Sequence, residues 1–138
     1  MSLIINPYAL GGVETLTAPS IYFVDGGTGE AFLCTDGATF VSKGRPPGLP
    51  TDSGLGRIIQ MSSGVYVAAP NKAVASGGTV PGIYYTTNPL AGWTFKSLGF
   101  GIRDIATDGT TVVAVGETGN IQYATDPAGT WTAWTSGV

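Results

Sequence analysis

The sequence predicts an all-β protein built from three consecutive units of four short antiparallel strands. Gly and Pro supply 31 of the 138 residues, which leaves little room for helices because both residues interrupt them. In addition, a short β-rich run followed by a turn and an aromatic residue occurs three times along the chain. Self-similarity of this kind indicates a repeated supersecondary unit.

The three recurring segments align on one turn residue and on the aromatic residue that follows it. The aligned turn residues are Asp36, Asn88 and Asp126. The aromatic residues are Phe40, Trp93 and Trp131. The turn residues are 52 and 38 positions apart. The stretch 69–82, rich in Asn, Ser, Gly and Pro, predicts a loop that accounts for the longer interval.

Each unit divides into four expected strands. In the third unit these are 102–107, 111–115, 120–124 and 130–134; in the second, 57–61, 65–69, 83–86 and 93–97; in the first, 15–18, 20–24, 30–34 and 39–42. Asp-Gly and Gly-Gly dipeptides between β-branched runs favour hairpin turns because they tolerate positive φ. The run Val112–Val115 is apolar on both faces, which predicts a strand covered on both sides.

Four-stranded antiparallel units with a period near 40 residues are typical of propeller blades. We therefore expect three propeller-like blades that form part of a ring and are completed by oligomerisation. The expected blades span about 13–44, 55–99 and 100–138, and form one β domain (13–138) after an N-terminal arm (1–12). A β-sandwich or a barrel is the alternative architecture.

The turn sequence resembles the Asp-box of sialidase-type propellers, Ser/Thr-x-Asp-x-Gly-x-Thr-Trp. Residues 124–131 keep the Asp, the Thr and the Trp of this pattern, with Ala in place of the Ser and of the Gly. Residues 86–93 keep the hydroxyl residue and the Trp, with Asn in place of Asp. Residues 34–40 are one position shorter and end in Phe. The resemblance implies a turn between the third and fourth strands of each blade.

We expect structural roles for the residues of these turns. An Asp or Asn oxygen can accept hydrogen bonds from backbone N–H groups one or two residues on, and the aromatic residue is expected in the core. Trp134 follows Trp131 by three positions and lies on the opposite strand face. Candidate contacts with a ligand or partner are Trp134, Tyr84, Tyr85 and Tyr123.

Composition disfavours several classes of protein. The net charge is −3 and the six Lys and Arg residues are scattered, whereas nucleic-acid binding needs a basic cluster. No apolar run approaches the roughly 18 residues of a membrane span, and residues 1–7 lack the basic start of a signal peptide. Cys34 is the single cysteine, so that no intrachain disulfide is expected.

Catalytic chemistry has few candidates. The chain contains no His, which disfavours zinc sites and His-based general bases. It has three Arg and three Glu residues, and no carboxylate pair is marked by its context for glycoside hydrolysis. We expect no catalytic residue, no metal and no cofactor, and therefore no enzyme.

Three blades leave one uncovered face at each end. At about 25 cal/mol per Å², a face of a few hundred Å² forgoes on the order of 10 kcal/mol of burial. This is comparable with the whole stability of a domain, about 5–15 kcal/mol. We expect a second copy of the chain (three plus three blades) or other proteins to cover these faces.

A small, cysteine-poor, Gly- and Thr-rich β protein with degenerate Asp-boxes resembles bacteriophage virion proteins of tail fibres, baseplates or head decorations. The resemblance implies a non-enzymatic structural or attachment component of a virion, assembled in the host cytoplasm, with other virion proteins as partners. A host surface glycan is a candidate ligand. The alternative function is a carbohydrate-binding propeller lectin, and a degraded hydrolase fragment ranks last.

Overall fold

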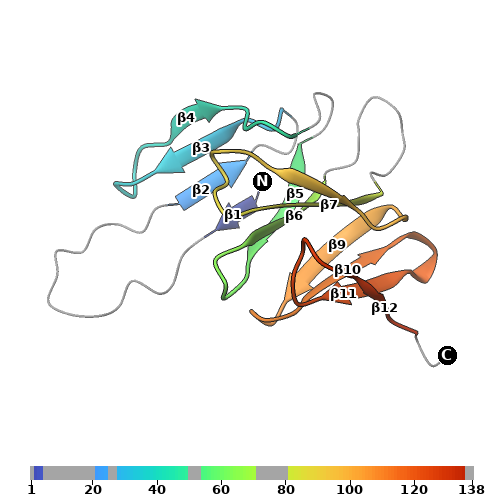
Figure 1. Ribbon diagram of the computed structural model, residues 1–138. Coiled ribbons are helices and arrows are strands. Elements are labelled where there is room, and N and C mark those ends of the chain that lie inside the picture. Colours follow the sequence, from blue (N-terminus) through green and yellow to red (C-terminus); the bar gives the residue numbers. More distant parts are fainter. Residues whose placement is uncertain (1, 5–20, 25–27, 50–53, 71–80, 136–138) are drawn as a thin grey trace, which may run out of the picture.

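The computed structural model describes residues 2–4, 21–24, 28–49, 54–70 and 81–135. This part of the chain contains twelve β-strands, one short 3₁₀ turn and no α-helix. The strands form three four-stranded antiparallel sheets in which sequential strands are neighbours (Figure 1). The fold is all-β, as the sequence predicts.

We call the three sheets the first, second and third blades. The first contains β1 (Ser2–Ile4), β2 (Ile21–Val24), β3 (Ala31–Cys34) and β4 (Val41–Gly44). The second contains β5 (Leu55–Gln60), β6 (Tyr66–Pro70), β7 (Gly82–Thr86) and β8 (Thr94–Ser97). The third contains β9 (Ile102–Thr107), β10 (Val112–Gly116), β11 (Ile121–Ala124) and β12 (Thr132–Ala133), with the 3₁₀ turn Glu117–Gly119 between β10 and β11.

The first strands of the blades lie in a row. Strand β1 contacts β5, and β9 contacts both β5 and β6. In Figure 1 the later strands of the first and third blades lie progressively farther from β1 and β9, in the order that the sheet topology gives. The second blade therefore lies between the other two, and the first and third blades stand at the ends of an open series.

Eleven of the twelve expected strands lie within two residues of their observed bounds. The exception is the first strand of the first blade. The expected strand 15–18 lies outside the described residues, and Ser2–Ile4 instead pairs antiparallel with Tyr22–Val24. The prediction that residues 1–12 form an arm outside the blades is therefore wrong for Ser2–Ile4. Connections between neighbouring strands are usually short, so that the expected first strand was placed next to β2. In the structure, 16 residues separate β2 from its partner β1.

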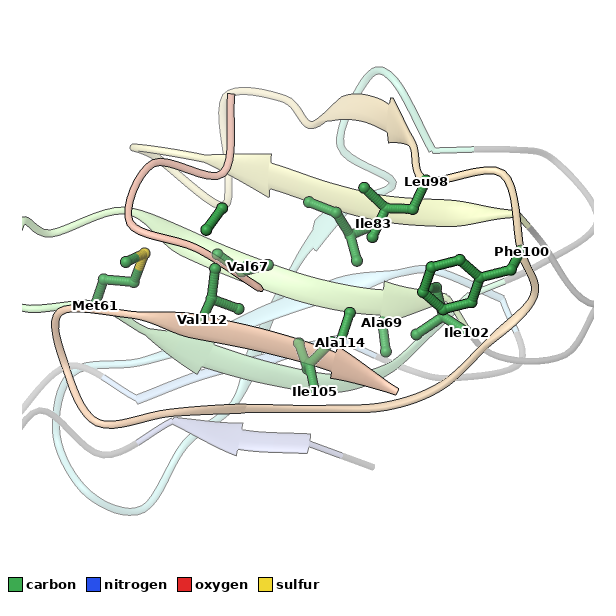
Figure 2. Packing of buried hydrophobic residues seen from close by; sticks show 11 residues of the cluster. Met61, Val67, Ala69, Ile83, Leu98, Phe100, Ile102, Ile105, Val112 and Ala114 are labelled. Atoms are coloured by element: carbon green, nitrogen blue, oxygen red, sulfur yellow. The ribbon is translucent and has the colours of Figure 1, made fainter. Parts of the chain in front are cut away.

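Buried apolar side chains fill the space between neighbouring blades. The cluster between the second and third blades includes Val67, Ile83, Ile105, Val112 and Ala114 (Figure 2). The cluster between the first and second blades includes Ala31, Leu55, Ala68, Tyr84 and Trp93. Strand β6 is buried along its whole length because alternate residues enter the two clusters.

Strand β10 differs from this pattern. Val112 and Ala114 are fully buried against the second blade, whereas Val113 is half-buried and Val115 is 36% exposed. The prediction that Val112–Val115 is covered on both sides is therefore wrong within the single chain. The reason is the position of β10 in the fold, since within the described part of the chain the third blade contacts another blade on one face only.

Candidate functional site

Three aligned side chains hold the turns between the third and fourth strands. Asp36 Oδ1 accepts hydrogen bonds from the N–H groups of Ala38 (2.9 Å) and Thr39 (2.7 Å). These bonds lower the pKa of Asp36 because they favour its charged form, and the bond from the Thr39 backbone has the largest effect. Asn88 Oδ1 accepts from the N–H of Leu90 at 3.0 Å, and Asp126 Oδ1 accepts from the N–H of Ala128 at 2.9 Å. All four of these hydrogen bonds stay within their own turn.

Asp108 holds a similar turn between β9 and β10. The Asp108-Gly109 dipeptide predicts the position of this turn, but not the hydrogen bonds of the Asp108 side chain. Its Oδ1 accepts from the N–H groups of Thr110 (2.8 Å) and Thr111 (2.7 Å). Hydrogen bonds from these two backbone groups, Thr111 first, lower the pKa of Asp108. Residues 36–39 and 108–111 share the sequence Asp-Gly-x-Thr, a signal that predicts the second turn from the first.

Two of the aligned aromatic residues pack between blades. Trp93 is 4% exposed within the cluster between the first and second blades. Trp131 is half-buried against the cluster between the second and third blades. The indole N–H of Trp93 donates to the carbonyl of Pro89, and that of Trp131 to the carbonyl of Pro127, both at 3.1 Å. Each tryptophan thus lies on the side of its blade that meets the preceding blade.

The third aligned aromatic residue, Phe40, is not in the core. It is 50% exposed and belongs to neither buried cluster, which corrects the sequence-based expectation. Phe40 directly precedes β4, as Trp93 precedes β8 and Trp131 lies just before β12. No blade of the described residues precedes the first, and half of the Phe40 side chain is exposed.

The candidate contact residues separate into two pairs. Tyr84 is 5% exposed inside the cluster between the first and second blades, and Tyr85 packs against the cluster between the second and third blades. Both therefore pack in the core. Tyr123 and Trp134 come together on the third blade, with ring centroids 5.7 Å apart and planes at 71°. Trp134 is 58% exposed.

Tyr123 and Trp134 belong to a largely apolar face that we call the outer face of the third blade. Strand register places Ala106, Val113, Val115, Ile121 and Tyr123 on this face together with the polar Asp104 and Thr132, and Trp134 contacts Tyr123. The face carries an open hollow of about 710 Å³. The hollow is lined by Val113, Tyr123 and Trp134 together with Asp108.

Strand register relates this face to a buried face of the second blade. Val67 pairs with Ile59 and Tyr85, and Val113 pairs in the same way with Ala106 and Tyr123. On this correspondence Val113, Val115 and Ile121 occupy the positions of Val67, Ala69 and Ile83. The residues of the second blade are 0%, 3% and 0% exposed because the third blade covers them. The outer face therefore has the side-chain pattern of an interblade surface, and no blade of the described residues covers it.

All six carboxylates in the described residues have a partner. Three of them, Asp36, Asp108 and Asp126, accept from their own turns. Glu30 accepts from the Ser42 hydroxyl. Asp104 pairs with Arg57 at 2.9 Å between the third and second blades, and Glu117 pairs with Arg103 at 2.8 Å.

The described residues offer no group of three or more His, Cys, Asp or Glu side chains that could hold a metal ion. Cys34 is buried, and its thiol donates to Asp36 Oδ1 at 3.4 Å. Among the same residues there is no helix long and apolar enough to cross a membrane.

Comparison with known proteins adds one structural relationship. No protein-family model matches the chain, and no curated protein sequence matches it. The chain is similar to the crystal structure of the GH74 enzyme of Niastella koreensis, with a TM-score of 0.64 and 17% sequence identity. The match covers 95% of this chain and 22% of that one, so that the chain spans about a fifth of the length of the enzyme. The enzyme is a β-propeller, and the three sheets described here have the fold of propeller blades.

Proposed function

We propose that this chain is a non-enzymatic structural protein, a three-blade sector of a β-propeller that works by binding further blades across its end faces. The observation that carries the proposal is the outer face of the third blade. Its positions repeat those that the second blade buries against the third, yet Val115 is 36% exposed where Ala69 is 3% exposed. The blade has an interblade surface on both sides and a neighbour on only one.

Energetics favour a partner for this face. Burying a large apolar side chain stabilises a protein by about 1.5–3 kcal/mol, and the outer face exposes Val115 and Trp134 beside half-buried Tyr123. Contiguous apolar patches of this kind on soluble proteins mark interaction surfaces. A blade packed on the outer face would bury these side chains as the third blade buries Val67.

The carboxylates support a structural role rather than hydrolysis. Glycoside hydrolysis requires two carboxyl groups that flank the scissile bond. Each of the six carboxylates described here already holds a turn, a hydroxyl group or an arginine. The likeness to the GH74 enzyme, at 17% identity, is a likeness of fold.

Light scattering during size-exclusion chromatography tests the proposal. We expect the purified chain to elute with a molar mass above that of its 14.0 kDa monomer, and to lose mass only on strong dilution. A folded, monodisperse species of 14.0 kDa at every concentration would contradict the proposal. The chain would then be stable with its outer face exposed to water and no partner bound.

The setting that we propose for this role is a bacteriophage virion, on the sequence resemblance alone. Mass spectrometry of phage particles purified from a culture that produces the chain tests it. We expect the chain at a fixed ratio to the major structural proteins of the particle. Recovery of the chain only in the fraction that contains no particles would contradict a virion location.

The contact between Tyr123 and Trp134 favours a second function, carbohydrate binding. An exposed indole beside a hollow can stack on the apolar face of a sugar ring, and Asp108 lines the same hollow. A glycan array probed with the native chain and with Trp134→Ala tests this alternative. Binding by the monomeric native chain that the variant loses would support a lectin and contradict coverage of the hollow by a blade.

A further inference from the structure

We infer that the outer face of the third blade binds the first blade of a second copy of this chain. The two copies then join head to tail, and Phe40 of one copy enters the hollow beside Tyr123 and Trp134 of the other. This inference rests on the proposed function and names its partner. The hollow is an incomplete site that the second copy fills.

The interfaces within the chain supply the template. Where the second blade meets the third, Trp131 of the later blade packs against the cluster to which Tyr85 of the earlier blade also belongs. Where the first blade meets the second, Trp93 of the later blade and Ala31 of the earlier one belong to the same buried cluster. An aromatic residue just before the fourth strand therefore lies at each interblade interface, on the side of the preceding blade.

The first and third blades each carry one half of this interface at the surface of the described residues. Phe40 has the position of Trp93 and Trp131 but is 50% exposed. Tyr123 has the position of Tyr85, by its pairing with Val113, and lines an open hollow. Placing the first blade of one copy after the third blade of another continues the existing series and brings these two residues together.

The exposed hydrophobic residues are distributed as this arrangement requires. Five large hydrophobic side chains of the described residues are exposed: Phe40, Val41, Phe95, Val115 and Trp134. Val115 and Trp134 lie on the outer face of the third blade, and Phe40 has the aromatic position that faces a preceding blade. Three of the five thus belong to the two halves of the missing interface.

A second copy is favoured over an unrelated blade because this chain carries both the position of Trp93 and Trp131, at Phe40, and the position of Tyr85, at Tyr123, and both lie at the surface. A head-to-tail contact of this kind is heterologous and closes into a ring when the rotation between copies allows it. Two copies closed in this way give six blades and two equal interfaces.

Three single substitutions test the inference: Phe40→Asp, Val115→Asp and, as the matched control, Phe95→Asp. All three side chains are exposed, so that each variant monomer is expected to fold. Phe95 lies on β8 of the second blade and is 42% exposed. The centroid of its ring lies 5.2 Å from that of Tyr84. We expect F40D and V115D each to raise the concentration for half-association by more than about 30-fold, as loss of an interface hot spot does. We expect F95D to associate like the native chain, and circular dichroism checks that each variant keeps its β structure.

The outcomes separate this inference from the proposed function. Association that V115D abolishes and F40D leaves intact would overturn the head-to-tail arrangement, while the proposed function would stand with another partner on the outer face. Association that F95D weakens as much as F40D would also overturn it, since general surface hydrophobicity would then drive assembly. A native chain that stays monomeric would contradict both.

Discussion

Single carboxylates stabilise the tight turns of this protein by accepting hydrogen bonds from backbone N–H groups. At Asp36 these bonds lower the pKa below its ordinary value of 3.8, so that the ionised side chain stabilises the folded state above that value. The contribution falls as the pH drops and is lost once the folded protein also protonates Asp36.

The substitution Asp36→Asn tests this account, because Asn can accept the same bonds without a charge, as Asn88 does. We expect the native protein to melt at a higher temperature than D36N at neutral pH. The difference between the two melting temperatures should shrink as the pH falls from about 4 to about 2. Thermal melts followed by circular dichroism measure it, and Asp108→Asn should behave in the same direction. A gap that is independent of pH would contradict the role of the charge.

The tryptophans divide into buried and exposed side chains with different expected effects. Trp93 is 4% exposed and bonds to Pro89, whereas Trp134 is 58% exposed. We expect Trp93→Ala to lower the free energy of unfolding by about 3–5 kcal/mol and Trp134→Ala to change it by less than about 0.5 kcal/mol. Urea unfolding of both variants under dissociating conditions measures the difference. Similar losses in the two variants would show that the burial of Trp93 is not what stabilises this region.

At the scale of elements, the connection between the first and second blades depends on a close backbone approach. Gly48 has φ +89°, and a Cβ there would lie 1.8 Å from the carbonyl oxygen of Trp93. The neighbouring Pro47 carbonyl accepts the N–H of Trp93 at 2.8 Å. Gly64 also has positive φ, +86°, but a Cβ there would meet nothing within 4 Å.

Substituting alanine at Gly48 and at Gly64 separates the cost of backbone strain, which both variants share, from the cost of steric overlap, which arises only at Gly48. We expect Gly64→Ala to cost about 1–2 kcal/mol, the penalty for a left-handed conformation alone. Gly48→Ala should cost at least about 2 kcal/mol more, because the backbone of Trp93 must move. Urea unfolding gives both values, and equal losses would mean that the approach to Trp93 contributes nothing.

The strands of the second and third blades were predictable because their hairpins carry local signals. Asp108-Gly109 marks the turn between β9 and β10, and β-branched runs flank it. Strand β1 was not predictable in this way, because its pairing with β2 joins residues far apart in sequence and no turn motif specifies it. Local patterns define hairpins, and they leave long-range edge pairing undetermined.

The candidate site was predictable only in part, because alternation gives the two faces of a strand but not which of them is covered. Tyr84 and Tyr85 were expected as candidate contacts and prove to be packed on opposite faces of one central blade. Tyr123 and Trp134 remain on the surface because the third blade stands at the end of the series. Position in the series, which the strand pattern does not encode, decides the difference.

At the scale of the whole molecule, the third blade is apolar on both faces although the chain covers only one. Val112 and Ala114 meet the second blade, and Val113 and Val115 face outward. In a protein with only 11% charged residues, this composition is what the proposed association with a further blade requires. Under the proposed function, one repeated interface joins blades within the chain and between chains.

Mixing the two variants with opposite defects tests the central claim most directly. In a head-to-tail pair of one F40D copy and one V115D copy, one interface carries both substitutions and the other carries neither. We therefore predict that F40D and V115D, each monomeric alone, form a complex of about twice 14.0 kDa when mixed, as measured by sedimentation equilibrium. A mixture that stays at 14.0 kDa, while the native chain associates, would contradict head-to-tail joining of the blades.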